Sequence, residues 1–80
     1  METVLLGASE VCARVGISNR QLEYWVLIGV VEPATERHGA KIHRKFSEKD
    51  LMVLRRVKKL TDEGFLVSRA AEKVKRTLKG

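Results

Sequence analysis

The segment from residue 8 to residue 31 constrains the fold more than any other part of this chain. It holds two short amphipathic stretches with a brief interruption between them. In that interruption Gly16 suits the left-handed conformation that ends a helix, and Ser18 is a favoured N-cap for the next helix. The pattern therefore predicts a helix over about residues 9–15, a tight turn, and a second helix over about residues 19–28. Two short helices joined in this way form a helix-turn-helix.

Apolar side chains mark one face of each of these two helices. Helical spacing predicts that Leu22, Trp25 and Val26 of the second helix point into a core. The opposite side of that helix is mostly polar and is free to meet a partner. The first helix would bury Ala8, Val11, Cys12 and Val15, and the exposed side of the second would carry Asn19, Arg20, Glu23 and Tyr24, with Gln21 at its edge.

A basic β-hairpin is predicted after the second helix, over residues 35–46. Pro33 blocks further helix, and the tetrapeptide at residues 38–41 is the expected tip. Ile42 and Phe46 are expected to pack inward, and the strand register stays open. The basic and histidine side chains of this hairpin are Arg37, His38, Lys41, His43, Arg44 and Lys45.

Two more helices are predicted after the hairpin. Ser47 and Asp50 approximate a capping box at the start of the third helix, and Gly64 is expected to end it. Apolar residues between positions 67 and 78 recur at helical spacing and predict a fourth helix. A short strand is expected over residues 4–6. The third helix would present Leu51, Val53, Leu54, Val57 and Leu60 to the core.

The charge of the chain is unevenly distributed. Its 80 residues, enough for a single domain over residues 1–80, include 16 basic and 10 acidic side chains. The first 33 residues carry two basic and four acidic side chains, whereas the other 47 carry fourteen and six. The later elements are therefore expected to create a positive field that attracts polyanions.

Several classes of function find no support in the sequence. No apolar run is long enough to span a bilayer, and no signal peptide is recognisable, so a cytoplasmic protein is expected. The single cysteine, Cys12, excludes an intrachain disulfide and a cysteine-based zinc site. His38 and His43 lack further obvious ligands, so no metal is expected. No nucleophile–base set or phosphate-binding glycine loop is visible; neither an enzyme nor a cofactor is predicted.

Four segments, in order and at compatible spacing, resemble the DNA-binding domain of the MerR family. The first is LGASEVCARVGIS at residues 6–18, and the second is NRQLEYW with IGVVEP at residues 19–33. The third is RKFSEKDL at residues 44–51, which resembles the family's passage from wing to third helix. The fourth is Leu60 with EGF at residues 63–65. Together they span most of the chain.

This resemblance implies a mainly α winged helix-turn-helix of about four helices with a small β-hairpin wing. The second helix would enter the major groove of double-stranded DNA, and the hairpin would lie along the phosphates. The third and fourth helices would form a second wing. Family members typically bind promoters as dimers and regulate transcription, so a sequence-specific regulator that pairs as a homodimer on DNA is expected.

The expected DNA contacts have specific chemical reasons. Arg20 lies in the first turn of the second helix, where it reaches the groove or the backbone, and Tyr24 matches a family aromatic that contacts phosphate. The amides of Asn19 and Gln21 can pair with adenine, although both are also ordinary first-turn residues. Cations on the hairpin, together with Lys58 of the third helix, would neutralise phosphates and release counterions. The predicted DNA-contacting residues are Ser18, Asn19, Arg20, Gln21, Tyr24, Arg37, His38, Lys41, His43, Arg44, Lys45 and Lys58.

The chain departs from the family pattern in three places. Glu23 stands where the family commonly has arginine; its carboxylate repels phosphate but can accept a hydrogen bond from cytosine N4. Val26 and Leu27 replace a polar pair. The sequence also lacks the long dimerisation helix and the effector-binding domain, so it is expected to be either an excised DNA-binding domain or a small stand-alone member whose effector is unknown.

Two other functions compete with transcriptional regulation. An excisionase-like, architectural or packaging-initiation protein has a closely similar fold and would bind clustered repeats rather than promoters. A protein-interaction adaptor would instead use Leu27 and the apolar edge of the second helix, and its binding to DNA would show no strong dependence on salt.

Overall fold

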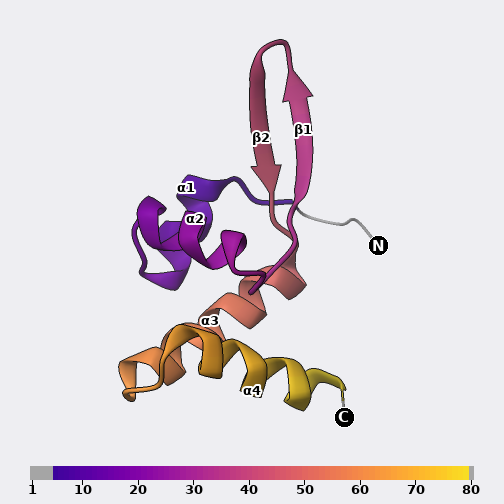
Figure 1. The fold of residues 1–80 in the computed structure, drawn as a ribbon. Helices are drawn as coiled ribbons and strands as arrows, with labels where there is room; N and C mark the ends of the chain where they lie inside the picture. Colours follow the sequence, from indigo (N-terminus) through magenta and orange to yellow (C-terminus); the bar gives the residue numbers. More distant parts are fainter. Residues whose placement is uncertain (1–4, 80) are drawn as a thin grey trace.

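The computed structural model describes residues 5–79, which form four helices and one two-stranded antiparallel sheet. The helices pack into a body from which the hairpin projects at one end (Figure 1). The elements in chain order are α1 (Ala8–Val15), α2 (Asn19–Leu27), β1 (Ala34–His38), β2 (Lys41–Lys45), α3 (Glu48–Asp62) and α4 (Val67–Lys79). This architecture confirms the winged helix-turn-helix predicted from the sequence.

The α1–α2 turn forms through local backbone and side-chain bonds. Gly16 has φ +84° and its N–H donates to the carbonyl of Cys12, which ends α1 in the predicted left-handed conformation. Ser18 Oγ accepts from the Gln21 N–H at 3.1 Å, and Gln21 Oε1 accepts from the Ser18 N–H at 3.0 Å. These two bonds make a capping box. The predicted N-cap is therefore confirmed, with Gln21 as a second participant.

The core is one cluster of buried apolar side chains drawn from every helix. Leu22 and Trp25 are each 2% exposed, as their helical spacing predicted, whereas Val26 packs at the margin of the core. On α4 the stripe is buried at Ala70, Ala71 and Val74. The remaining buried members from α1, the inter-helix segments and α3 are Leu6, Val11, Cys12, Val15, Ile17, Val30, Val31, Phe46, Leu51, Val53, Leu54 and Val57.

The hairpin turns at Gly39 and Ala40, and Gly39 has φ +63°. At its base the backbone of Phe46 pairs with that of Leu6 through two hydrogen bonds of 2.7 and 2.8 Å. This isolated bridge replaces the strand expected over residues 4–6, of which residue 4 lies outside the described residues. The bridge joins the chain's first described segment to the end of the wing.

One packing prediction for the hairpin is wrong. Phe46 is 0% exposed and belongs to the core, but Ile42 is 60% exposed. The physical reason is distance from the helices: Phe46 lies where β2 ends, whereas Ile42 lies near the tip of a hairpin that extends beyond the helical body (Figure 1).

The second half of the molecule is a pair of packed helices. Ser47 and Asp50 complete a capping box at the start of α3, with both bonds at 3.1 Å. α3 and α4 pack against each other, and Lys75 of α4 donates to the carbonyl oxygen of Gly29 at 2.6 Å. This bond ties α4 to the end of α2. Among the described residues, no helix has the length and apolar character required to cross a membrane.

Candidate nucleic-acid interface

An open cleft of about 600 Å³ separates the outer side of α2 from the hairpin. Arg44 of β2 reaches across it, with Nη1 3.6 Å from Glu23 Oε1. The Arg44 and Glu23 side chains are 42% and 71% exposed, so the pair adds at most about 1 kcal/mol to stability. The outer side of α2 and the base of the wing therefore face the same space. The cleft is lined by Arg20, Glu23, Tyr24, Val26, Leu27 and Arg44.

The strand register divides the predicted wing residues between two faces. Residues opposite each other in an antiparallel pair lie on the same face, and the faces alternate along each strand. The pairs Thr35–Arg44 and Arg37–Ile42 therefore share the face that holds Arg44. The other face carries Ala34, Glu36, His38, Lys41, His43 and Lys45.

Contacts between the two histidines agree with this division. The rings of His38 and His43 lie 5.5 Å apart at their centroids in an edge-on arrangement. His38 Nε2 is 3.2 Å from Glu36 Oε2. Within residues 5–79 no group of three or more His, Cys, Asp or Glu side chains is placed to hold a metal ion. Of the six predicted wing residues, only Arg37 and Arg44 thus share the face that Arg44 turns toward α2.

Polar groups at the amino end of α2 are partly engaged within the protein. Asn19 Oδ1 accepts from the thiol of Cys12 at 3.2 Å, and Gln21 Oε1 is used in the capping box. The amide nitrogens of Asn19 and Gln21 have no such role among the described residues. Arg20 is exposed and forms no ion pair within the part of the chain that the structure describes. Arg20 is therefore the least engaged of the predicted groove-facing side chains.

Cys12 is buried behind this turn. Burial raises the pKa of its thiol, because a thiolate would lose hydration there. A protonated, buried thiol is a poor nucleophile. Its contact with Asn19 instead holds α1 and α2 together.

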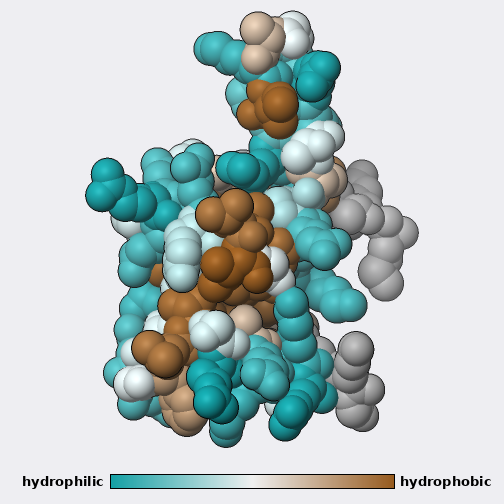
Figure 2. Space-filling view, in the orientation of Figure 1, coloured by the Kyte–Doolittle hydropathy of each residue, from teal (hydrophilic) through white to brown (hydrophobic). Residues whose placement is uncertain are grey.

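Apolar side chains form a band across the helical body, bordered by hydrophilic ones (Figure 2). Leu27 and Leu66 are the most exposed large apolar residues described, at 82% and 73%, while Tyr24 is 54% exposed. Tyr24 and Ile28 also line a second cleft with Ser68, Ala71, Glu72 and Lys75 of α4. The exposed side of α2 is thus partly apolar, as the departures at Val26 and Leu27 predicted.

Lys58 is the one predicted contact that lies outside the α2–hairpin region. Its ammonium nitrogen lies 2.6 and 2.7 Å from the two carboxylate oxygens of Asp62, one turn later on α3. The Lys58 side chain is 27% exposed. The structure therefore engages this cation within α3, away from the cleft.

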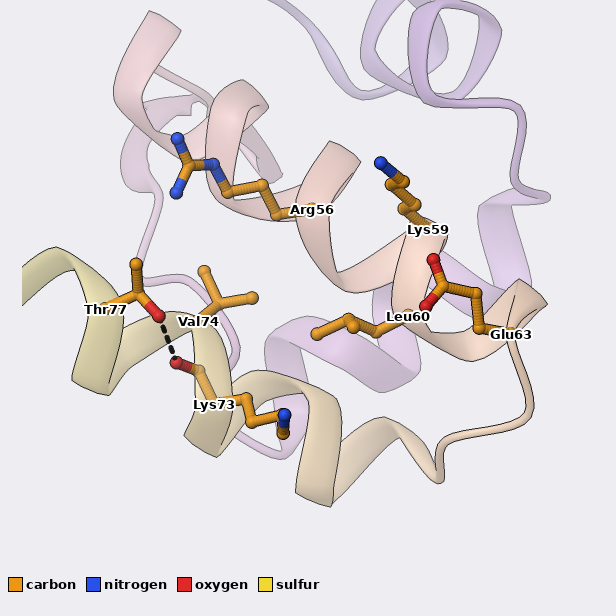
Figure 3. Close-up of a pocket in the computed structure, with 7 residues that line it drawn as sticks. All are labelled: Arg56, Lys59, Leu60, Glu63, Lys73, Val74 and Thr77. Carbon is orange, nitrogen blue, oxygen red and sulfur yellow. Dashed lines mark hydrogen bonds between the residues drawn. The ribbon is translucent and has the colours of Figure 1, made fainter.

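A separate basic groove lies between α3 and α4. Figure 3 shows Arg56 and Lys59 extending from α3 and Lys73 from α4 around Leu60 and Val74. Residues 71 and 75 of α4 face α2, and helical spacing turns Lys73 and Thr77 to the opposite side. This groove is therefore distinct from the α2–hairpin cleft.

Sequence reasoning did not include Glu23 among the site residues, although the structure places it inside the cleft. Glu23 lies three residues after Arg20 on the same exposed side of α2, and this spacing could have placed it in the site. Its partner Arg44 follows twenty-one positions later on another element. No local pattern links residues at that separation.

Comparisons with known proteins identify a family for this chain. A family model described as MerR HTH family regulatory protein matches residues 7–77. Uncharacterized HTH-type transcriptional regulators of Mycobacterium bovis and of two strains of Mycobacterium tuberculosis are 41% identical to this chain over 54 residues. That match covers 66% of this chain but 24% of each relative.

The fold also has a solved counterpart. A crystal structure of a MerR-family transcriptional regulator from Bacillus cereus superposes with a TM-score of 0.75 at 22% identity. The superposition covers 89% of this chain and 52% of that one, so the two share a fold over about half of the longer protein. With the family model matched over nearly the whole chain, this protein belongs to the MerR family of helix-turn-helix regulatory proteins.

Proposed function

We propose that this domain binds double-stranded DNA with sequence preference, as the DNA-binding part of a MerR-type transcriptional regulator. The observation that carries the proposal is the cleft in which Arg20 and Tyr24 of α2 lie together with Arg44 of the hairpin. A helix in the major groove with cations beside it is how helix-turn-helix domains combine base recognition with backbone contacts. Membership of a family of regulatory proteins supports the same role.

In this proposal the amino-terminal half of α2 enters the major groove. Arg20 is exposed and forms no ion pair among the described residues, so it is available to a guanine edge or to a phosphate. Tyr24 would donate its hydroxyl to the backbone. Because the side-chain oxygens of Asn19 and Gln21 are engaged, these residues would donate single bonds through their amide nitrogens instead of pairing bidentately with adenine. Ser18 would cap α2 and leave its helix terminus open to a phosphate.

The hairpin would contact the backbone beside the groove. Arg44 and Arg37 share the face that looks toward α2, so they would bind the phosphates nearest the recognised bases. Lys41 and Lys45, together with His38 and His43, lie on the other face and would meet phosphates of the opposite flank. Lys58 would contribute only after exchanging Asp62 for a phosphate.

The proposed role is binding without catalysis, carried out in the cytoplasm on DNA. A homodimer on a pair of half-sites is the assembly that we propose, since a single small domain buries little surface on DNA. The effector of the regulator would act outside this domain.

Direct binding measurements test the proposal. Labelled duplexes enriched from a random pool by the wild type would be titrated with Arg20→Ala, Arg44→Ala and the control Arg56→Ala. Each cleft variant should lose about 1–3 kcal/mol of binding free energy, while Arg56→Ala, in the separate basic groove, should bind almost as the wild type. Equal affinities for all four proteins at low salt would place the interface elsewhere.

Two other functions predict different outcomes. An excisionase-like or packaging protein would use the same cleft but would select clustered repeats in genomic DNA instead of promoters. The 82% exposure of Leu27 favours a protein-interaction adaptor as the second candidate. An adaptor would bind the enriched duplexes no better than random ones.

A further inference from the structure

The Glu23–Arg44 pair has a use beyond holding the wing beside α2. Glu23 is the fifth residue of α2 and follows Arg20 by three positions, so both project from the exposed side of the helix. Its side chain is 71% exposed. A carboxylate in this position would enter the major groove wherever Arg20 does.

The structure also compensates the charge of this carboxylate. Without a neighbouring cation, the Glu23 carboxylate would be repelled by phosphates. Arg44 Nη1 lies 3.6 Å from Oε1 and offsets part of its charge, while Arg20 in the same cleft leaves the group of three with a net positive charge. At 3.6 Å this contact is an ion pair that is too long for a hydrogen bond. Among the described residues, the carboxylate of Glu23 therefore remains available to accept a hydrogen bond.

The chemistry of the base edges then decides the partner. In the major groove guanine presents two acceptors and thymine an acceptor with a methyl group, so neither offers a donor to a carboxylate. Adenine has a donor at N6, but its neighbouring N7 acceptor repels negative charge. Cytosine presents the N4 amino donor without an adjacent acceptor. A paired carboxylate on α2 is therefore complementary to cytosine alone.

We infer that Glu23, paired with Arg44, is a specificity-determining residue that recognises a cytosine in the major groove. This role rests on the proposed DNA-binding function. Arg44 acts on the base through Glu23 and is a positioning residue in this respect, besides its own contact with phosphate.

Selection of duplexes from a random pool tests the inference. Wild type, Glu23→Gln, Glu23→Asp and Glu72→Gln would each be carried through the same rounds and sequenced. Glu72→Gln is the matched control, because it removes the same charge and also breaks an exposed pair with arginine, at Arg76 on α4. The wild-type motif should contain a cytosine that Glu23→Gln replaces by adenine, since glutamine pairs with adenine N6 and N7.

Titrations of the selected duplexes give the magnitude. Wild type should prefer cytosine at that position by roughly five- to a hundredfold. Glu23→Asp should retain the preference at reduced strength, and Glu72→Gln should enrich the wild-type motif. If Glu23→Gln enriches the wild-type motif unchanged, this role of Glu23 is refuted while sequence-specific binding stands. If the wild type enriches no motif, the proposed function fails and the role of Glu23 fails with it.

Discussion

Some polar side chains at the start of α2 form hydrogen bonds within the protein, whereas others remain available to a partner. Cys12 and Asn19 bond to each other across the α1–α2 turn, and Ser18 and Gln21 close the cap of α2. These bonds orient the start of α2 and reduce the freedom of its polar groups. Arg20 carries no such bond among the described residues, so its charge is left for an external ligand.

The buried thiol of Cys12 leads to a prediction about alkaline stability. Because burial raises the pKa of this thiol, the unfolded chain loses the proton at a lower pH than the folded chain. The contribution of the protonated thiol to the free energy of unfolding is fully present below the ordinary pKa of a thiol. This contribution is lost as pH rises through the raised pKa of the folded protein. The melting temperature should therefore decrease more steeply with rising pH for wild type than for Cys12→Ala. Parallel curves for the two proteins would show that the thiol titrates alike in both states.

Replacement of Glu23 by arginine should strengthen non-specific binding to DNA. The substitution removes a carboxylate from the cleft and adds a cation beside the phosphates. Affinity for random duplexes at low salt should rise, and the slope of log K against log salt should steepen by about 0.9 for each added phosphate contact. Glu72→Arg on α4 makes the same change of charge outside the cleft and serves as the control. Equal or weaker binding by Glu23→Arg would show that residue 23 points away from the phosphates or makes a specific base contact.

Helices and strands are stabilised here by different means. Each of α2 and α3 begins with a complete capping box, so its start is encoded by adjacent residues. The hairpin has no core of its own, and a two-stranded hairpin alone is marginal in water. It depends on attachments at its base, the Leu6–Phe46 bridge and the pair between Arg44 and Glu23.

Two substitutions should separate the base of the hairpin from its outer part. Phe46→Ala removes a ring that is 0% exposed and should reduce the free energy of unfolding by about 3–5 kcal/mol. Ile42→Ala alters a side chain that is 60% exposed and should change it by no more than about 0.5 kcal/mol. Urea denaturation followed by circular dichroism measures both. A large loss in Ile42→Ala would mean that the outer hairpin packs on the helical body.

Positive charge and apolar surface lie in different regions of the molecule. Its net charge of +6 comes from the hairpin and from α3 and α4, while the early helices supply the polar and apolar groups of the cleft. The described residues extend over 40 × 30 × 20 Å, with the hairpin at one end and the α3–α4 pair at the other (Figure 1). Cations thus lie on both sides of α2.

Salt dependence should report how many of these cations meet phosphate. The affinity for duplex DNA should fall linearly in a plot of log K against log salt. Arg44→Ala should reduce the steepness by about 0.9, the value for one phosphate contact, whereas Arg56→Ala should leave it unchanged. Anisotropy titrations at several salt concentrations measure these slopes. A flat dependence in the wild type would favour the protein-interaction adaptor.

Much of the fold could be predicted from neighbouring residues, because helix starts, stops and buried faces depend on local chemistry. Gly16 ends α1, Ser47 with Asp50 starts α3, and the spacing of Leu22 and Trp25 identifies the core face of α2. Periodicity places such residues because a helix repeats its geometry every few positions. The fold class and the capped helix-turn-helix were therefore present in the sequence alone.

Tertiary structure decided what local patterns leave open. The hairpin register turned Arg44 toward Glu23, and the distance of the outer hairpin from the helices left Ile42 outside the core. Register and orientation follow from where Phe46 enters the core and pairs with Leu6, a contact between residues forty positions apart. The sequence alone determined which elements form and which of their faces are apolar; only packing between distant segments decided which charged side chains meet in the cleft.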